Sequence, residues 1–215
     1  MNRILLIDDH PIMRHGLAQL LRMEDGLEVC GEAGSARDGL TAIERLRPDL
    51  VILDLTLPDK HGIELLKDIQ ALHPGLRCLI LSMHDESLYA ERALRAGARG
   101  YIMKEAAADH LVTAVRKILS GGIYLSDGMS SRMIEQLSGA RGRPGVTGIE
   151  NLTDRELEVL SLIGAGSATK LIAERLGISA RTVEAHRAHI KEKLGVTDGA
   201  ALVRYAVQWV ENQSG

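Results

Sequence analysis

The sequence predicts a doubly wound α/β domain with a five-stranded parallel sheet, followed by a small all-α domain of four helices. Over residues 3–120, short apolar runs alternate with helix-length segments, and the runs lack the polar alternation of half-exposed strands. Such runs are typical of strands covered on both faces, and five strand–helix units indicate a parallel sheet with right-handed crossovers. A glycine-rich break and a new helix start near residue 150 predict the second domain.

The expected elements of the first domain follow one another regularly. The apolar runs that predict strands are Ile4–Ile7, Leu27–Gly31, Leu50–Leu53, Leu76–Leu81 and Gly100–Ile102. The segments that predict helices lie near residues 11–23, 36–46, 62–72, 86–96 and 107–120. Ligands of doubly wound sheets bind beyond the carboxyl ends of the strands, so a site is expected at that edge.

Residues 139–148 contain four glycines and a proline, which predicts a flexible linker. We place the first domain at residues 1–120, the linker with a short helix near 127–137 at residues 121–149, and the second domain at residues 150–215. Thr153 and Glu156 have the spacing of a capping box and predict the start of its first helix. Three further helices are expected near residues 168–176, 180–194 and 199–211, with Ser179 as the N-cap of the second.

The charge of the chain excludes a strongly basic protein. Its 26 Lys and Arg residues stand against 29 Asp and Glu residues, and residues 151–215 contain eight of each kind. Composition alone therefore does not indicate nucleic-acid binding, and any DNA contact must come from a local concentration of positive charge.

No feature of the sequence indicates secretion or a membrane. Asp8 and Asp9 interrupt the first apolar run, so it does not resemble a signal peptide, and no segment approaches the roughly 20 apolar residues of a membrane span. Cys30 and Cys78 lie in apolar runs without metal-binding spacing, which fits free thiols in a reducing compartment. We therefore expect a cytoplasmic protein without membrane contact.

Five polar residues stand at the carboxyl ends of expected strands: Asp8, Asp9, Asp54, Ser82 and Lys104. Each alone also fits a solvated strand end, but all five lie at one edge of a parallel sheet. Carboxylates within about 4 Å of one another would repel by roughly 4 kcal/mol per pair at an effective dielectric of 20, so they need positive charge nearby. Lys104 supplies one charge, and carboxylate oxygens suit Mg²⁺. The sequence therefore predicts a magnesium site in which a carboxylate can attack phosphorus.

Residues 1–120 resemble the receiver domains of bacterial two-component response regulators. The resemblance rests on the pair Asp8-Asp9, Asp54 with Pro58 and Gly62 after it, Ser82, and Lys104 preceded by Tyr101. It implies a flavodoxin-like fold in which a sensor histidine kinase phosphorylates Asp54. It also implies that Mg²⁺ is bound by Asp8, Asp9 and Asp54. It also implies that Ser82 and Lys104 hold the phosphoryl group, and that Ser82 and Tyr101 form the switch. A plain core position for Tyr101 stays open.

Four further residues near the pocket have less defined roles. Thr56 and His84 each lie two residues beyond a pocket residue, where the family tunes phosphate loss. His84 fits either a contact to the hydrolytic water or a solvated loop histidine. His10 and His61 fit ordinary loop or capping residues.

The segment 180–194 predicts a helix with one apolar and one polar side. Val183, Ile190 and Leu194 fall on the core side, whereas Arg181, Glu184, Ala185, Ala188 and Glu192 fall on the opposite arc. Small residues on that arc let a helix approach base edges in the major groove. Arg187, Lys191 and Lys193 lie toward the flanks. The same charges also fit a solvated helix with Glu184–Arg187 pairing.

The order of residues favours DNA binding. Leu152-Thr-Asp-Arg-Glu156, Ala173-Glu-Arg-Leu-Gly-Ile178 and Ser179-Ala-Arg-Thr-Val-Glu-Ala-His186, followed by Lys193-Leu-Gly195, resemble a LuxR-type DNA-binding domain. With the receiver, the whole chain resembles the NarL/FixJ family of transcriptional regulators. The resemblance implies a scaffold helix at 168–176, a recognition helix at 180–194 and a dimerisation helix at 199–211. The expected DNA contacts are Lys170, Arg181, Thr182, Glu184, Ala185, Arg187, Ala188, Lys191 and Lys193.

Two positions depart from the pattern of the family. Thr169 stands where the family commonly has Asn, and Glu184 stands where some members have Lys. Because a glutamate can accept a hydrogen bond from cytosine N4, we hypothesise that Glu184 reads a C·G pair.

The resemblance implies a regulator whose phosphorylation on Asp54 switches dimerisation and binding to operator DNA, and it leaves a contact with RNA polymerase open. Two alternatives remain. An aspartyl-phosphate enzyme, such as a haloacid-dehalogenase-like phosphatase, typically carries a second Asp where this chain has Thr56, and no phosphate-binding P-loop motif is present. A DNA binder or adaptor with a vestigial receiver that works without phosphorylation is the other alternative.

Overall fold

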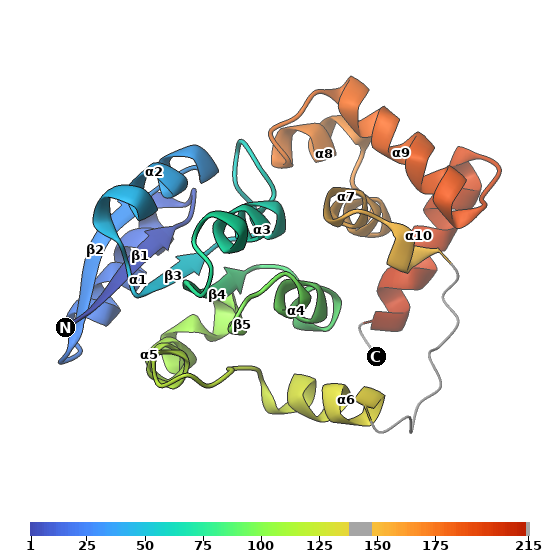
Figure 1. Cartoon of the computed structure of the whole chain (residues 1–215). Coiled ribbons are helices and arrows are strands. Elements are labelled where there is room, and N and C mark those ends of the chain that lie inside the picture. Colours follow the sequence, from blue (N-terminus) through green and yellow to red (C-terminus); the bar gives the residue numbers. More distant parts are fainter. Residues whose placement is uncertain (138–147, 214–215) are drawn as a thin grey trace. The chain divides into compact units, whose positions relative to one another are not determined.

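The computed structural model describes residues 1–137 and 148–213, and the chain divides into two compact units between residues 137 and 138 (Figure 1). Apart from Gly148, the glycine-rich stretch that predicts the linker lies outside the described residues. The helix expected near residues 127–137 is present as α6 (Asp127–Leu137), and it belongs to the first unit.

One sheet of five parallel strands forms the centre of the first unit, in the order β2-β1-β3-β4-β5. The strands are β1 (Asn2–Ile7), β2 (Leu27–Ala33), β3 (Leu50–Leu53), β4 (Arg77–Ser82) and β5 (Gly100–Met103). The sequence prediction of a doubly wound parallel sheet is confirmed. The direction of winding reverses between β1 and β3, and doubly wound sheets of this order bind their ligands at that point.

Helices cover both faces of this sheet (Figure 1). They are α1 (Pro11–Arg22), α2 (Ala36–Leu46), α3 (Gly62–Leu72), α4 (Glu86–Arg95) and α5 (Ala107–Leu119), with a 3₁₀ turn η1 (Lys104–Ala106) before α5. Side chains alternate between the faces: Leu6 joins the core formed with α1 and α5, whereas Ile7 packs against Gly39 of α2. Because both faces are covered, the strands have no polar alternation.

The segment after α5 returns to the edge of the sheet, which the sequence analysis did not predict. The Tyr101 amide donates to the Tyr124 carbonyl at 3.1 Å, and the Tyr124 amide donates to the Arg99 carbonyl at 2.9 Å. The Ser126 amide donates to a carboxylate oxygen of Glu86 at 3.1 Å, and α6 then contacts α4. This segment is therefore joined to both β5 and α4.

The second unit is helical. It contains the 3₁₀ turn η2 (Ile149–Asn151) and the helices α7 (Asp154–Gly164), α8 (Thr169–Arg175), α9 (Ala180–Leu194) and α10 (Gly199–Gln213). The predicted capping box of Thr153 and Glu156 is confirmed, and the predicted N-cap Ser179 accepts a hydrogen bond from the Thr182 amide at 3.0 Å. Buried aliphatic side chains from all four helices form its core: Leu157, Leu160, Ile172, Val183, Ile190 and Leu202.

Across residues 1–137 and 148–213, no helix combines the length and the apolar character that crossing a bilayer requires.

Candidate functional site

Asp8 and Asp54 each directly follow one of the two strands at the switch point. The pattern of sheet hydrogen bonds continues one residue beyond each strand. The Asp8 amide donates to the Ala33 carbonyl at 3.1 Å, and the Asp54 amide donates to the Ile7 carbonyl at 2.8 Å. Both carboxylates are buried, with 3% and 2% of each residue exposed. The structure thus brings together two acidic residues that are 46 positions apart, as expected for the carboxyl edge of parallel strands.

Lys104 lies between these carboxylates. Its Nζ is 2.7 Å from Asp54 Oδ2 and 2.7 Å from Asp8 Oδ2, and all three side chains are at least 96% buried. The backbone supplies further donors, since the His10 amide donates to Asp8 Oδ1 at 2.7 Å and the Thr56 amide to Asp54 Oδ1 at 3.3 Å. One ammonium group therefore faces two buried carboxylates, so the cluster is negative with all three groups ionised, and Asp9 makes it more negative.

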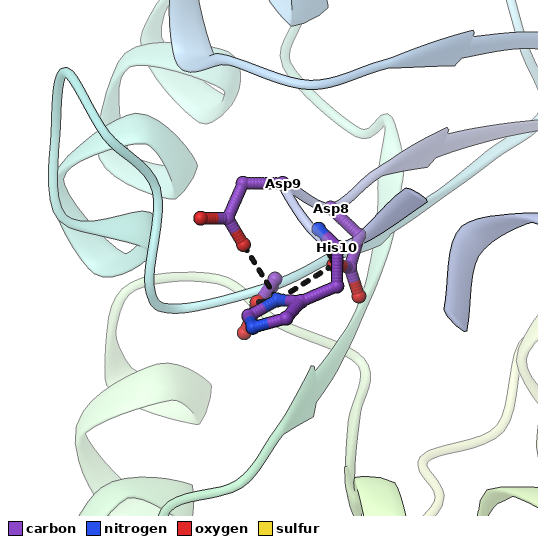
Figure 2. Close-up of side chains that lie close together, drawn as sticks. Asp8, Asp9 and His10 are labelled. Atoms are coloured by element: carbon purple, nitrogen blue, oxygen red, sulfur yellow. Dashed lines mark hydrogen bonds and ion pairs between the residues drawn. The ribbon is translucent and has the colours of Figure 1, made fainter. Parts of the chain in front are cut away.

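Asp9 and His10 lie beside Asp8 on the more exposed side of this cluster (Figure 2). His10 Nδ1 lies 2.6 Å from Asp9 Oδ1 and 3.3 Å from Asp8 Oδ1, and it is 3.9 Å from Asp54 Oδ2. The His10 side chain is 59% exposed, so it covers the carboxylates from the solvent side. His10 stands at the N-cap position of α1 without a side-chain capping bond, which fits the expected loop or capping residue, and its contacts to the two aspartates were not predicted.

Ser82 and Tyr101 both contact the backbone of His84. The His84 amide donates to Ser82 Oγ at 3.2 Å, and the Tyr101 hydroxyl donates to the His84 carbonyl at 2.8 Å. Tyr101 is buried, so its ring occupies a core position. The His84 imidazole lies 3.2 Å from the Thr56 hydroxyl and is half-buried, so it is not a freely solvated loop side chain. His61 caps α3 by accepting from the Ile63 amide, as one of its two interpretations predicts.

Burial dominates the electrostatics of the pocket. Desolvation raises the pKa of Asp54 to about 6, against the lowering effect of Lys104. For Lys104, burial disfavours the ammonium form, but the neighbouring Asp54 and Asp8 outweigh it and raise its pKa. The raised pKa of Asp54 thus reflects burial first, whereas the raised pKa of Lys104 reflects the negative charge of its two carboxylate neighbours.

The donor atoms of the pocket fit a divalent cation. One ligand atom from each of Asp8, Asp9, His10 and Asp54 can be chosen so that all lie within 4.8 Å of one another. Three of these ligands are carboxylate oxygens, which suit Mg²⁺. Asp9 is half-buried, so a cation beside it stays accessible to water and to phosphate oxygens. The residues present therefore fit the expected magnesium ion.

A second candidate surface lies in the second unit, on α8 and α9. Val183 and Ile190 of α9 are buried, whereas five residues of the opposite arc are exposed: Arg181, Glu184, Ala185, Ala188 and Glu192. Thr182 and Lys170 are exposed as well, and Arg187 and Lys191 are half-buried on the flanks. The recognition arc is therefore open to solvent within its own unit.

Two charged residues of this surface, Glu184 and Lys193, have polar partners on other helices that the sequence did not predict, and the Glu184–Arg187 pair that it did predict is also present. The Thr169 hydroxyl donates to Glu184 Oε1 at 2.8 Å, and Arg187 Nε lies 3.6 Å from the same oxygen. Lys193 Nζ lies 2.6 Å from Oε2 of the buried Glu156, so a phosphate contact by Lys193 would compete with this ion pair. Thr169 lies beyond the set of DNA contacts expected from the sequence, although its departure from the family pattern was a signal.

Family models match both units. Residues 4–116 match the response regulator receiver domain, and residues 150–206 match the luxR family of bacterial regulatory proteins. The first match covers the acidic pocket with its four strand ends, and the second covers α7, α8 and α9.

Curated relatives match over nearly the whole chain. The transcriptional regulatory protein MctR of Rhizobium johnstonii is 40% identical over 205 residues, covering 95% of this chain and 92% of MctR. The transcriptional regulatory protein UhpA of Escherichia coli is 39% identical over 201 residues, covering 94% of this chain and 95% of UhpA. Both relatives are thus similar through receiver, linker and helical unit alike.

Solved structures match the fold over the whole chain or over part of it. RcsB of Salmonella enterica serovar Typhimurium, bound to the promoter rprA with the phosphomimetic BeF₃⁻, has a TM-score of 0.63 and 27% identity; the match covers 96% of this chain and 99% of RcsB. A response regulator of the LuxR family from Aurantimonas is 37% identical with a TM-score of 0.59, covering 63% of this chain and 97% of that one.

Proposed function

The chain belongs to the two-component response regulators that join a receiver domain to a LuxR-type DNA-binding domain, and we propose from this that a sensor histidine kinase phosphorylates Asp54. In this proposal, residues 1–120 receive the phosphoryl group, residues 121–149 connect the domains, and residues 150–215 bind operator DNA. The proposal places the chain in the cytoplasm, where operator DNA is found.

One observation carries the proposal: Asp54 is a buried carboxylate at the switch point, with Lys104 Nζ 2.7 Å from its Oδ2 and two further aspartates beside it. Three carboxylates share a single ammonium group here. Such a cluster is a poor means of stabilising the fold, because the ammonium group offsets only part of the free-energy cost of desolvating the carboxylates. The arrangement instead suits a site where charge is added and held during phosphoryl transfer.

The chemistry follows from the side chains. A carboxylate oxygen of Asp54 attacks phosphorus, a P–O bond forms, and the P–N bond of the donor phosphohistidine breaks. The leaving imidazole nitrogen keeps the electron pair and takes up a proton. Lys104 and the Ser82 hydroxyl then hold oxygens of the new acyl phosphate, since both lie at the same edge of the sheet.

Asp8, Asp9 and Asp54 would hold the magnesium ion. When bound, Mg²⁺ offsets the carboxylate charges and coordinates phosphate oxygens. The Lys104 contact to Asp8 and Asp54 restrains the orientation of both carboxylates.

The output is a change in DNA binding. Phosphorylation adds nearly two negative charges beside Lys104. This charge shifts the receiver between two conformations that differ at Ser82 and Tyr101. We infer that the phosphorylated chain dimerises and places two α9 helices one turn of DNA apart. RcsB, which is 27% identical to this chain, has been solved as two dimers bound to two parallel DNAs, and this supports the inference.

Phosphorylation of the full chain tests the proposal. Wild type, Asp54→Asn and Asp109→Asn are incubated with acetyl phosphate and Mg²⁺, and intact mass is measured. Asp109 is an exposed carboxylate of α5, so it is a matched control. We expect one phosphoryl group per chain in the wild type and in Asp109→Asn, none in Asp54→Asn, and loss of uptake with EDTA. Uptake by Asp54→Asn equal to wild type, or steady release of phosphate over many turnovers, would contradict the proposal.

The same variants decide whether the receiver is vestigial. Affinity for a duplex selected by the wild-type chain is measured with and without acetyl phosphate. We expect phosphodonor to raise the affinity of the wild type and of Asp109→Asn, but not that of Asp54→Asn. Equal affinity for all three chains in both conditions would favour a DNA binder that works without phosphorylation.

A further inference from the structure

Thr169 and Glu184 connect the two helices of the helix-turn-helix on its exposed side. We propose that Thr169 is a positioning residue that holds the Glu184 carboxylate to accept a hydrogen bond from a cytosine amino group, so that the pair determines specificity for one C·G base pair. The inference rests on the proposed function, because it requires that α9 enter the major groove.

The geometry joins two residues that are 15 positions apart in the chain. The Thr169 hydroxyl, in the first turn of α8, donates to Glu184 Oε1 at 2.8 Å across the turn. The preceding residue, Ala168, has no side-chain capping bond, so the Thr169 hydroxyl serves α9 rather than the start of its own helix. Threonine has few side-chain rotamers in a helix, so its hydroxyl is held in place with little further loss of entropy.

Arg187 approaches the same oxygen from within α9. Its Nε lies 3.6 Å from Glu184 Oε1, and its side chain is only 19% exposed, whereas that of Glu184 is 59% exposed. Both contacts use Oε1, and Oε2 takes part in neither. A hydrogen bond from Thr169 therefore holds one oxygen of the carboxylate, with the Arg187 guanidinium nearby, and neither contact uses the other oxygen.

An ionised carboxylate only accepts hydrogen bonds, which restricts the bases it can read. Cytosine presents an amino donor in the major groove, whereas guanine presents the acceptors N7 and O6, which would repel a carboxylate. Adenine presents a donor beside the acceptor N7, and thymine presents an acceptor and a methyl group. Cytosine is therefore the base that Glu184 accommodates without an opposing acceptor. Arg187 reduces the repulsion between this carboxylate and the phosphates.

The alternative is that Glu184 and its partners form only a solvated polar cluster. Exposed ion pairs contribute little, and the 3.6 Å contact of Arg187 is common on helix surfaces. The hydrogen bond of Thr169 distinguishes the two, because it comes from another helix and restrains the direction of the carboxylate. A cluster without a role in recognition would change no base preference when it is removed.

The experiment uses the full chain with acetyl phosphate and Mg²⁺. Wild-type protein selects duplexes from a randomised pool, and affinities are then measured for the selected duplex and for every single base-pair variant of its half-site. The variants are Glu184→Gln, Thr169→Val, Thr169→Ala and the conservative Thr169→Ser. Thr197→Val is the matched control, because Thr197 is an exposed threonine after α9. Fluorescence of Trp209, the one tryptophan of the chain, reports folding of each variant.

We expect wild type to prefer C·G at one position by about 10-fold or more over the other pairs. Glu184→Gln should flatten this preference, and Thr169→Val and Thr169→Ala should reduce it by about 3-fold to 10-fold at that position alone. Thr169→Ser and Thr197→Val should keep it.

A uniform loss of affinity on all duplexes in Thr169→Val and Thr169→Ala would show a merely structural role and overturn the inference. Unchanged preferences in Glu184→Gln would overturn it as well. If the wild type enriches no sequence at all, the proposed function fails, and the inference fails with it.

Discussion

Lys193 Nζ lies 2.6 Å from Glu156 Oε2, and this contact joins the last turn of α9 to the first turn of α7. Glu156 also accepts from the Thr153 amide at 2.8 Å through the same oxygen, so one buried carboxylate satisfies a helix start and anchors a second helix. The position of the recognition helix on its scaffold therefore depends on an ion pair as well as on the apolar core.

Replacing Lys193 by Met tests this anchor. The change leaves the buried Glu156 carboxylate with the Thr153 amide but without its cation. Because Lys193 is 33% exposed, we expect a loss of only about 1–2 kcal/mol in the stability of the helical domain. Urea unfolding followed by Trp209 fluorescence measures it, since Trp209 is buried in α10. Lys191→Met is the control; an equal loss there would contradict an effect of this pair.

The same carboxylate predicts a pH dependence. Burial alone would raise the pKa of Glu156, but hydrogen bonds from Lys193 and Thr153 outweigh it and lower the pKa below its usual value of 4.5. A lowered pKa in the folded state means that the stabilisation is fully present above pH 4.5 and is lost as the pH falls through the lower folded value. The free energy of unfolding of the helical domain, measured with urea, should thus fall more steeply toward acid pH in wild type than in Glu156→Gln. Glu174→Gln, an exposed glutamate of α8, should follow the wild type; equal slopes in all three chains would refute the prediction.

The two cysteines should differ sharply in reactivity. Both are free; Cys78 lies buried in β4, and burial raises its pKa to about 12, whereas Cys30 is half-buried and has a pKa raised to a lesser degree. Because the thiolate is the reactive form, a disulfide reagent at pH 8 should label one thiol per native chain and the second only in denaturant. Cys30→Ser should remove the faster reaction and Cys78→Ser the slower one. Rapid native labelling of Cys30→Ser would contradict the buried position of Cys78.

The pocket could be predicted from the sequence because topology alone brings it together. Asp8 and Asp54 each follow an apolar run, and parallel strands place such ends at one edge whatever the details of packing. His10 could not be assigned, since a loop histidine beside two aspartates has the same sequence whether its ring turns toward the carboxylates or away. Tyr101 shows the same limit: its core position is confirmed, its hydroxyl donates to the His84 carbonyl, and its switch role stays a prediction.

Long-range polar contacts could not be predicted. Lys193 and Glu156 are 37 positions apart, and each fits an ordinary role on its own helix, as a flanking cation and as a capping residue. Thr169 and Glu184 were identified as departures from a family pattern, but no periodicity shows that they touch. The pairing of Tyr124 with β5 was missed because a segment of a few residues carries too little alternation to predict a strand.

Gly62 allows α3 to approach the segment after β3 that carries Asp54. A Cβ on Gly62 would lie 2.3 Å from the Asp54 carbonyl oxygen and 2.6 Å from Leu55 Cα, and the Gly62 amide already donates to the Leu55 carbonyl at 2.7 Å. Gly62→Ala must therefore displace the loop that carries Asp54, at a cost of about 1–3 kcal/mol in stability. Phosphoryl uptake from acetyl phosphate should slow as well, because the carboxylate moves relative to Lys104.

Gly16→Ala is the matched control for this substitution. Gly16 lies inside α1, and a Cβ there would meet no atom within 4 Å, so alanine should stabilise the receiver by about 0.5–1 kcal/mol through helix propensity. Thermal unfolding by circular dichroism and the rate of phosphoryl uptake are measured for both variants. Both substitutions add the same methyl group. A higher unfolding midpoint for Gly16→Ala and a lower one for Gly62→Ala would therefore show that the loss comes from the close contact at Gly62. Equal midpoints and equal uptake rates in the two variants would mean that the backbone of α3 can move away from Asp54 without consequence.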